Sequence, residues 1–152
     1  MKILILWPFS YPSICGVWSR AYSDAKYLTE KGYEVHIFSS NIIKSTKNTA
    51  KSYELLEGIH LHRFPVKTSI GDNAKFWDFE EELIKLRPEI IHSHIYRHPH
   101  THKASVIAKK LNLPFILTTH APFIKGEVRG LKKAILVYLY DLIFARRFFQ
   151  RC

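Results

Sequence analysis

The sequence predicts an α/β fold in which a doubly wound parallel sheet carries helices on both faces. Short β-branched runs alternate with longer amphipathic segments along the chain. The 152 residues, 47% of them apolar and 14% aromatic, suffice for the core of one ordinary domain. Right-handed crossovers between parallel strands cover each face of a sheet in turn. We therefore expect a Rossmann-like sheet of order 3-2-1-4-5, with its ligand crevice at the carboxyl ends of the first and fourth strands.

Five short apolar runs predict the strands of this sheet. They span residues 2–7, 34–39, 59–64, 89–94 and 115–120. Residues 41–57, between the second and third strands, contain the polar run KSTKNTAK. We interpret this segment as a mobile surface loop.

Apolar residues at helical spacing predict four helices. The first spans residues 16–31 and ends at Gly32, a residue type that readily adopts the left-handed conformation found after helices. The second runs from an N-cap at Asn73 to Leu86, with Phe76, Phe79, Leu83 and Leu86 facing inward. The third begins at Pro99, which suits a first helical turn. A long apolar segment at 131–149 with basic ends predicts the last helix.

Charge and cysteine usage restrict the cellular setting and the partners. The formal net charge of +10 favours anionic partners such as nucleic acid, phosphorylated ligands or a lipid surface. Cys15 and Cys152 can form neither a disulfide framework nor a four-ligand zinc site. The opening KILILW lacks the features of a secretory signal, so we expect a cytoplasmic protein.

The first loop at the predicted crevice is PFSYPSICGVW, which begins at Pro8. Gly16 leads directly into a helix, so backbone N–H groups there could face a phosphate or a sugar oxygen. The G-x-G-x-x-G spacing of a dinucleotide site is missing. A glycine required only for a tight turn is the alternative interpretation.

The second loop begins at His94, in a segment with five histidines in eleven residues, HSHIYRHPHTH. His92 and His94 alternate on a strand and share a face, as in an H-x-H metal arm. None of the other predicted strand ends offers an Asp or Glu, so we predict no metal site. We expect His94 to open into the crevice, His92 to be a hydrogen-bonded core residue, and the histidines of residues 98–102 to be loop and cap residues.

The third loop begins at His120, in TTHAPF, where a histidine can donate to an oxygen or transfer a proton near neutral pH. A structural polar cap is the alternative. Further along, basic residues at both ends of the last predicted helix flank AILVYLYDLIFA, twelve residues that are too few to span a bilayer. This helix could lie on an anionic lipid surface or pack within or between domains.

In order and spacing, three segments resemble the N-terminal domain of family-4 glycosyltransferases of GT-B architecture. They are the opening KILILWPFSYPSICGVWSRAYSDAKYLTEKGYEVHIFSS, the strand PEIIHSHIYRH and the strand LPFILTTHAPF. The resemblance implies that residues 1–152 are the acceptor-side half of the enzyme. It also implies that the C-terminal donor-binding domain is absent from this chain, which alone is then expected to be inactive.

The resemblance also implies roles for individual residues. His120 matches the active-site histidine of the family and is the candidate catalytic residue. Gly16 matches the second glycine of a paired-glycine loop whose first glycine is here Cys15, and His94 matches the second histidine of the strand-four motif. The candidate substrate-binding residues are Tyr11, Cys15, Gly16, His94 and Arg97. No metal and no other cofactor is implied.

The implied activity is hexosyl-type transfer from a nucleotide sugar to an acceptor hydroxyl, with retention of anomeric configuration. The expected partners are the nucleotide sugar, a sugar or lipid-linked acceptor and the C-terminal domain of the same enzyme, but no nucleic acid. The basic helix at 129–151 adds the hypothesis of a peripheral location on the inner face of a membrane. Two alternatives remain: a noncatalytic Rossmann-like module for a phosphorylated ligand, and a histidine-cluster metal hydrolase.

Overall fold

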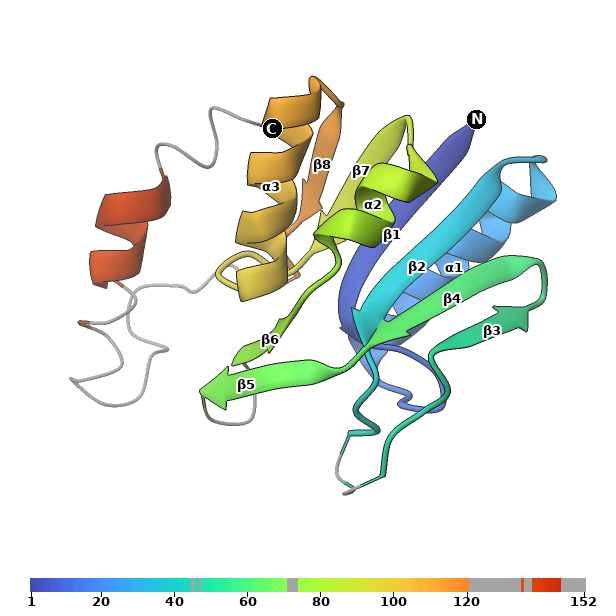
Figure 1. Ribbon diagram of the computed structural model, residues 1–152, viewed down its shortest axis with the longest axis horizontal. Coiled ribbons are helices and arrows are strands. Elements are labelled where there is room, and N and C mark those ends of the chain that lie inside the picture. Colours follow the sequence, from blue (N-terminus) through green and yellow to red (C-terminus); the bar gives the residue numbers. More distant parts are fainter. Residues whose placement is uncertain (45, 47, 71–73, 121–134, 136–137, 146–152) are drawn as a thin grey trace.

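The computed structural model describes residues 1–44, 46, 48–70, 74–120, 135 and 138–145. These residues contain a six-stranded sheet of order β3-β4-β2-β1-β7-β8, in which only β3 runs antiparallel to its neighbour (Figure 1). Its strands are β1 (Lys2–Phe9), β2 (Glu34–Ser40), β3 (Tyr53–Leu56), β4 (Ile59–Phe64), β7 (Ile90–His94) and β8 (Phe115–Thr118). The five parallel strands confirm the predicted 3-2-1-4-5 order.

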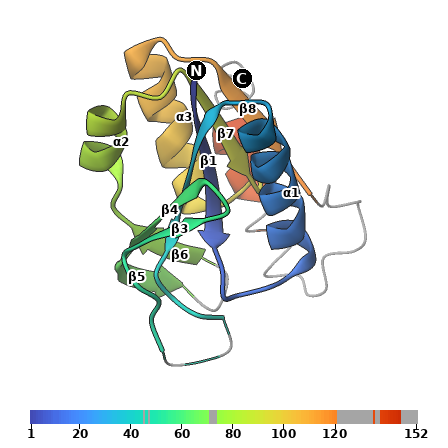
Figure 2. The same ribbon diagram turned by 90° about the vertical axis from the view of Figure 1, so that its right-hand side faces the viewer.

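Helices cover both faces of this sheet, as the sequence predicts. Helix α1 (Gly16–Glu30) lies on one face, and α2 (Glu80–Leu86) and α3 (Pro99–Leu111) lie on the other (Figure 2). The last two end at Arg87 and Asn112, which adopt the left-handed conformation. Pro88 directly follows Arg87, and a residue before proline is disfavoured in the helical region. The predicted stop of the second helix at this proline is therefore confirmed.

The alternation of side chains along β1 divides the core into two layers. Leu4 and Leu6 pack with the residues of α2 and α3, whereas Ile3, Ile5 and Trp7 pack with those of α1. All five are at least 96% buried. Burial of each aliphatic side chain contributes about 1.5–3 kcal/mol relative to exposure. The central strand is therefore apolar on both faces, as expected for a parallel sheet with two helical layers.

The predicted start of the second helix at Asn73 is wrong. Asn73 lies outside the described residues, but 74–77 form a strand, β6 (Ala74–Trp77), which pairs antiparallel with β5 (Val66–Ile70). Trp77 is buried while Phe76 is 36% exposed, so Phe76 does not face the core as predicted. Aromatic residues favour strands when a pairing partner is available, and β5 supplies it. Helix α2 begins only at Glu80.

The predicted surface loop at 41–57 contains structure that the sequence analysis missed. Its last residues form β3, which returns along β4 through a tight turn at Glu57 and Gly58. Both turn residues have positive φ, 48° and 84°, as the favoured two-residue hairpin turns require. An isolated bridge also joins Ile42 and Thr49. The segment before β3 therefore folds back on itself.

Most of the helix predicted at 131–149 lies outside the described residues. Residues 138–140 are helical and continue into the π-helical turn η1 (Asp141–Ala145), drawn in red beside α3 in Figure 1. None of the helices within the described parts of the chain has the length and apolar content needed to cross a membrane.

Candidate active site

His94 and His120 meet at the carboxyl ends of β7 and β8. His94 is the last residue of β7 and pairs in register with Thr118 of β8, two residues before His120. The His94 Nδ1 and His120 Nε2 atoms are 2.6 Å apart, within hydrogen-bond distance, and the two rings stack at 4.9 Å. His94 is fully buried, whereas His120 is partly exposed. This edge of the sheet therefore carries one buried and one partly exposed histidine.

His92 and Trp7 complete an aromatic group around this pair. The ring centroids of His92 and His94 are 4.3 Å apart, and Trp7 presents an edge-to-face contact to both His94 and His120. His92 Nε2 lies 2.8 Å from the Thr118 hydroxyl oxygen, which confirms the predicted hydrogen bond, but His92 is only partly buried and is not the core residue that was predicted. Trp7 was not among the predicted site residues, although its position at the end of a predicted apolar strand was an available signal.

The histidines of this group are uncharged near neutral pH. Burial, followed by the positive charge that His92 or His120 would carry, lowers the pKa of His94 to about 3. Burial and then the charge of Arg20 lower the pKa of His120, against the opposing effect of Asp24. A neutral imidazole can both donate and accept a hydrogen bond. The pair can therefore position a polar substrate group without adding positive charge.

The backbone at this edge adopts conformations that non-glycine residues rarely take. Ile95, Arg97 and His120 have positive φ values of 72°, 63° and 62°. The β-branched Ile95 is the most unfavourable of the three. The Thr101 hydroxyl donates to the Ile95 carbonyl at 2.7 Å, and the His100 ring lies 3.0 Å from the His94 carbonyl oxygen. Strain that is held in place by such contacts is typical of functional sites.

The amino end of α1 is open at the same edge of the sheet. Cys15 is the N-cap residue but makes no capping hydrogen bond with its side chain. The first N–H groups of a helix have no partner within the helix and attract anions. A Cβ atom added to Gly16 would meet no described atom within 4 Å. Neither a positive φ nor close packing therefore requires a glycine at this position. This does not support the alternative of a glycine that is needed only for a tight turn.

A buried arginine that the sequence analysis missed holds the loop before α1. The side chain of Arg63, at the end of β4, is only 1% exposed. It donates to the Ser10 hydroxyl at 2.9 Å, to the Tyr11 carbonyl at 2.8 Å and to the Glu54 carboxylate at 2.7 Å. Ser39 also donates to Ser10. Tyr11, 40% exposed, therefore sits on a fixed backbone.

Arg97 lies in a different environment from the one predicted for a substrate-binding residue. Its Nε donates to Asp141 of η1 at 2.8 Å, and the Tyr96 hydroxyl donates to the same carboxylate at 3.1 Å. The bond from Arg97 is the main cause that holds the pKa of Asp141 below its usual range. The guanidinium thus ties the loop after β7 to the last described helix.

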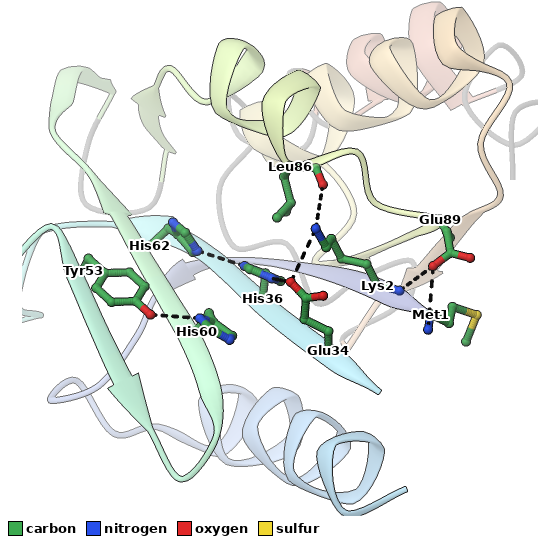
Figure 3. Close-up of polar contacts among 9 residues, drawn as sticks. All are labelled: Met1, Lys2, Glu34, His36, Tyr53, His60, His62, Leu86 and Glu89. Carbon is green, nitrogen blue, oxygen red and sulfur yellow. Dashed lines mark hydrogen bonds and ion pairs between the residues drawn. The ribbon is translucent and has the colours of Figure 1, made fainter. Parts of the chain in front are cut away.

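A second histidine cluster lies on the opposite face of the sheet, toward the amino ends of the strands (Figure 3). His36 Nδ1 is 2.9 Å from His62 Nε2, and its other ring nitrogen is 2.9 Å from the Glu34 carboxylate. Tyr53 contacts His60 at 2.8 Å. These side chains bond to one another rather than around a common centre. Across the described residues, no three His, Cys, Asp or Glu side chains are arranged to hold a metal ion.

The hollow beside α2, about 320 Å³ in volume, is a poor candidate for a phosphate-containing ligand. Phe64 and Phe79 line it together with Lys67, Lys85, Asp78 and the carboxylates of residues 80–82, so four acidic side chains outnumber two basic ones. Clustered negative charge disfavours a nucleotide or a phosphorylated ligand. The electrostatics favour the edge with His120 and the amino end of α1.

A comparison with protein families found a match over most of the chain. Residues 14–152, which include Cys15, Gly16, His94 and His120, match the family model described as Glycosyltransferase Family 4. A search of curated proteins found no match.

Proposed function

The chain belongs to glycosyltransferase family 4, and from this premise we propose that it is the acceptor-side half of a two-domain GT-B enzyme. The proposed reaction is transfer of a hexosyl group from a nucleotide sugar to an acceptor hydroxyl, with retention of configuration. The observation that carries this proposal is the contact between His94 and His120 at the carboxyl edge of the sheet. In open α/β sheets, ligands bind at this edge.

In this proposal His120 is the residue that touches the transferred sugar. Its ring is partly exposed, and one of its nitrogens is already engaged by His94. The lowered pKa of His120 keeps it neutral, so it acts as a hydrogen-bond donor to a sugar oxygen rather than as a cation. A positioned donor can stabilise charge that develops only in the transition state.

The amino end of α1 is proposed to face the diphosphate of the donor. Its first N–H groups lack a side-chain cap, and the space beside Gly16 is open among the described atoms. A backbone without a Cβ atom allows close approach of a ligand. Tyr11 and Cys15 flank this position and are proposed substrate contacts. The net charge of +10 supports an anionic donor. The proposed reaction uses no metal and no other cofactor.

The open amino end of α1 also favours a second candidate, a noncatalytic module that binds a phosphorylated ligand. Such a module would need the α1 terminus but not His120. The two candidates therefore differ in the residue on which function depends.

The proposed reaction is tested with the full-length protein, in which we expect a C-terminal donor-binding domain. Nucleotide sugars are supplied singly with sugar and lipid-linked acceptors, and release of the nucleoside diphosphate is measured. The anomeric proton of the product is then followed by NMR. We expect release that depends on both donor and acceptor, with retained configuration. Ligand binding without transfer would support the noncatalytic module, and an inverted product would contradict the retaining mechanism.

A further inference from the structure

His94 lies where a substrate cannot reach it. Its side chain is fully buried behind His120, and its Nδ1 atom is directed at His120 Nε2, 2.6 Å away. Strand pairing with Thr118 fixes its backbone, and the His100 Nε2 atom lies 3.0 Å from its carbonyl oxygen. A direct substrate contact by His94, as expected from the sequence, does not fit this burial.

Two neutral imidazoles joined by one hydrogen bond have two arrangements of protons. If His120 Nε2 donates, the proton of His94 lies on its own Nε2. If His94 Nδ1 donates, the proton of His120 lies on its Nδ1. The His94 Nε2 atom is buried and makes no hydrogen bond within the described chain. The first arrangement therefore leaves a buried N–H group without an acceptor.

Trp7 favours the second arrangement. Its indole N–H can only donate, is buried and also makes no hydrogen bond to a described residue. The Trp7 and His94 rings are in edge contact, with centroids 6.4 Å apart. In the first arrangement two unsatisfied donors lie in neighbouring rings. In the second, His94 Nε2 is an unsatisfied acceptor and only the Trp7 N–H remains an unsatisfied donor, and orphaned buried N–H groups are the rarer defect.

We propose that His94 is a positioning residue, which donates from Nδ1 to His120 Nε2 and so directs the Nδ1–H of His120 toward the substrate. This inference rests on the proposed function, in which His120 touches the sugar. The bond fixes both the ring orientation and the tautomer of His120, as residues behind catalytic histidines do in other enzymes. His120 Nδ1 makes no hydrogen bond to the described residues and is the nitrogen left for a ligand.

The tautomer is measured directly on the 152-residue chain, independently of any activity. Two-bond ¹H–¹⁵N correlations of the imidazole rings, recorded near neutral pH, identify the protonated nitrogen, and a His120→Gln variant assigns the signals. We expect protonation of His120 at Nδ1 and of His94 at Nδ1. Protonation of His120 at Nε2, or a fast-exchanging mixture, would overturn the proposal. Because no substrate is needed, this result stands apart from failure of the transfer reaction.

Two variants of the full-length protein separate positioning from simple packing. His94→Asn keeps an amide close to the place of Nδ1, whereas His94→Phe keeps the ring volume and removes the bond. We expect kcat of the Phe variant to fall about 10- to 100-fold, with partial rescue in the Asn variant. The acid limb of the pH profile of the Phe variant should move to higher pH, because His120 loses a bond that stabilises its neutral form. Equal turnover and unchanged pH profiles in the two folded variants would contradict positioning.

Discussion

At the scale of single residues, Arg63 shows how a site loop is held by a distant strand. Its buried guanidinium donates to the Ser10 hydroxyl and the Tyr11 carbonyl, as well as to Glu54. Removing such a donor leaves buried acceptors without partners, which costs more than the bond itself contributes. The arginine is therefore the main link between β4 and the loop that precedes α1.

We predict that Arg63→Met lowers the free energy of unfolding by about 2–4 kcal/mol. Urea denaturation of the chain measures this change. Glu54→Gln is the matched control, because its side chain is 36% exposed and its amide oxygen still accepts a hydrogen bond. The control should lose less than about 1 kcal/mol. Equal losses in the two variants would show that the ion pair, rather than the loop contacts, is what Arg63 contributes.

Only some of the residues proposed for the site could be predicted from the sequence. Gly16, His94 and His120 were identified because each stands in a short motif next to a predicted strand end. Arg63 and Asp141 were missed because their roles depend on partners 53 and 44 residues away in the chain. Only the folded sheet brings these partners together. An arginine on the inward face of a strand, at a position that alternation assigns to the core, was the available signal for Arg63.

At the scale of elements, the long amphipathic helices and apolar strands were predictable and the two hairpins were not. The aromatic residues Phe76, Trp77 and Phe79 fit either a helical stripe or an alternating strand followed by a helix start. Residues 74–77 form a strand because β6 pairs with β5, and the spacing of the aromatic residues alone cannot predict this pairing. The β3–β4 hairpin was missed for a similar reason, since Glu57 and Gly58 are not the commonest turn pair.

At the scale of the whole molecule, buried histidines link stability to pH. Burial lowers the pKa of His62 to about 4 and that of His94 to about 3, from about 6.5 in an unfolded chain. Between the folded-state pKa values and pH 6.5, the unfolded chain binds more protons than the folded chain. Stability is therefore complete above pH 6.5 and falls as the pH drops through this window.

We predict that the free energy of unfolding decreases between about pH 6.5 and pH 5, by at most about 1.4 kcal/mol per pH unit for each such histidine. Urea titrations at several pH values measure the slope. The variant His62→Gln, which lacks one titrating group of the cluster in Figure 3, should have a shallower slope. A slope that is flat in the unmodified chain would contradict neutral burial of these rings.

His120 is the central residue of the proposed site, and its replacement in the full-length protein is the most direct test. We predict that His120→Ala lowers turnover about 10- to 1000-fold, the range for loss of one positioned donor or proton-transfer group. His60→Ala removes a hydrogen-bonded histidine from the opposite face of the sheet and should leave turnover nearly unchanged. Both proteins should fold, as judged by their thermal transitions. Near-normal sugar transfer by a folded His120→Ala enzyme would contradict the site described for this chain.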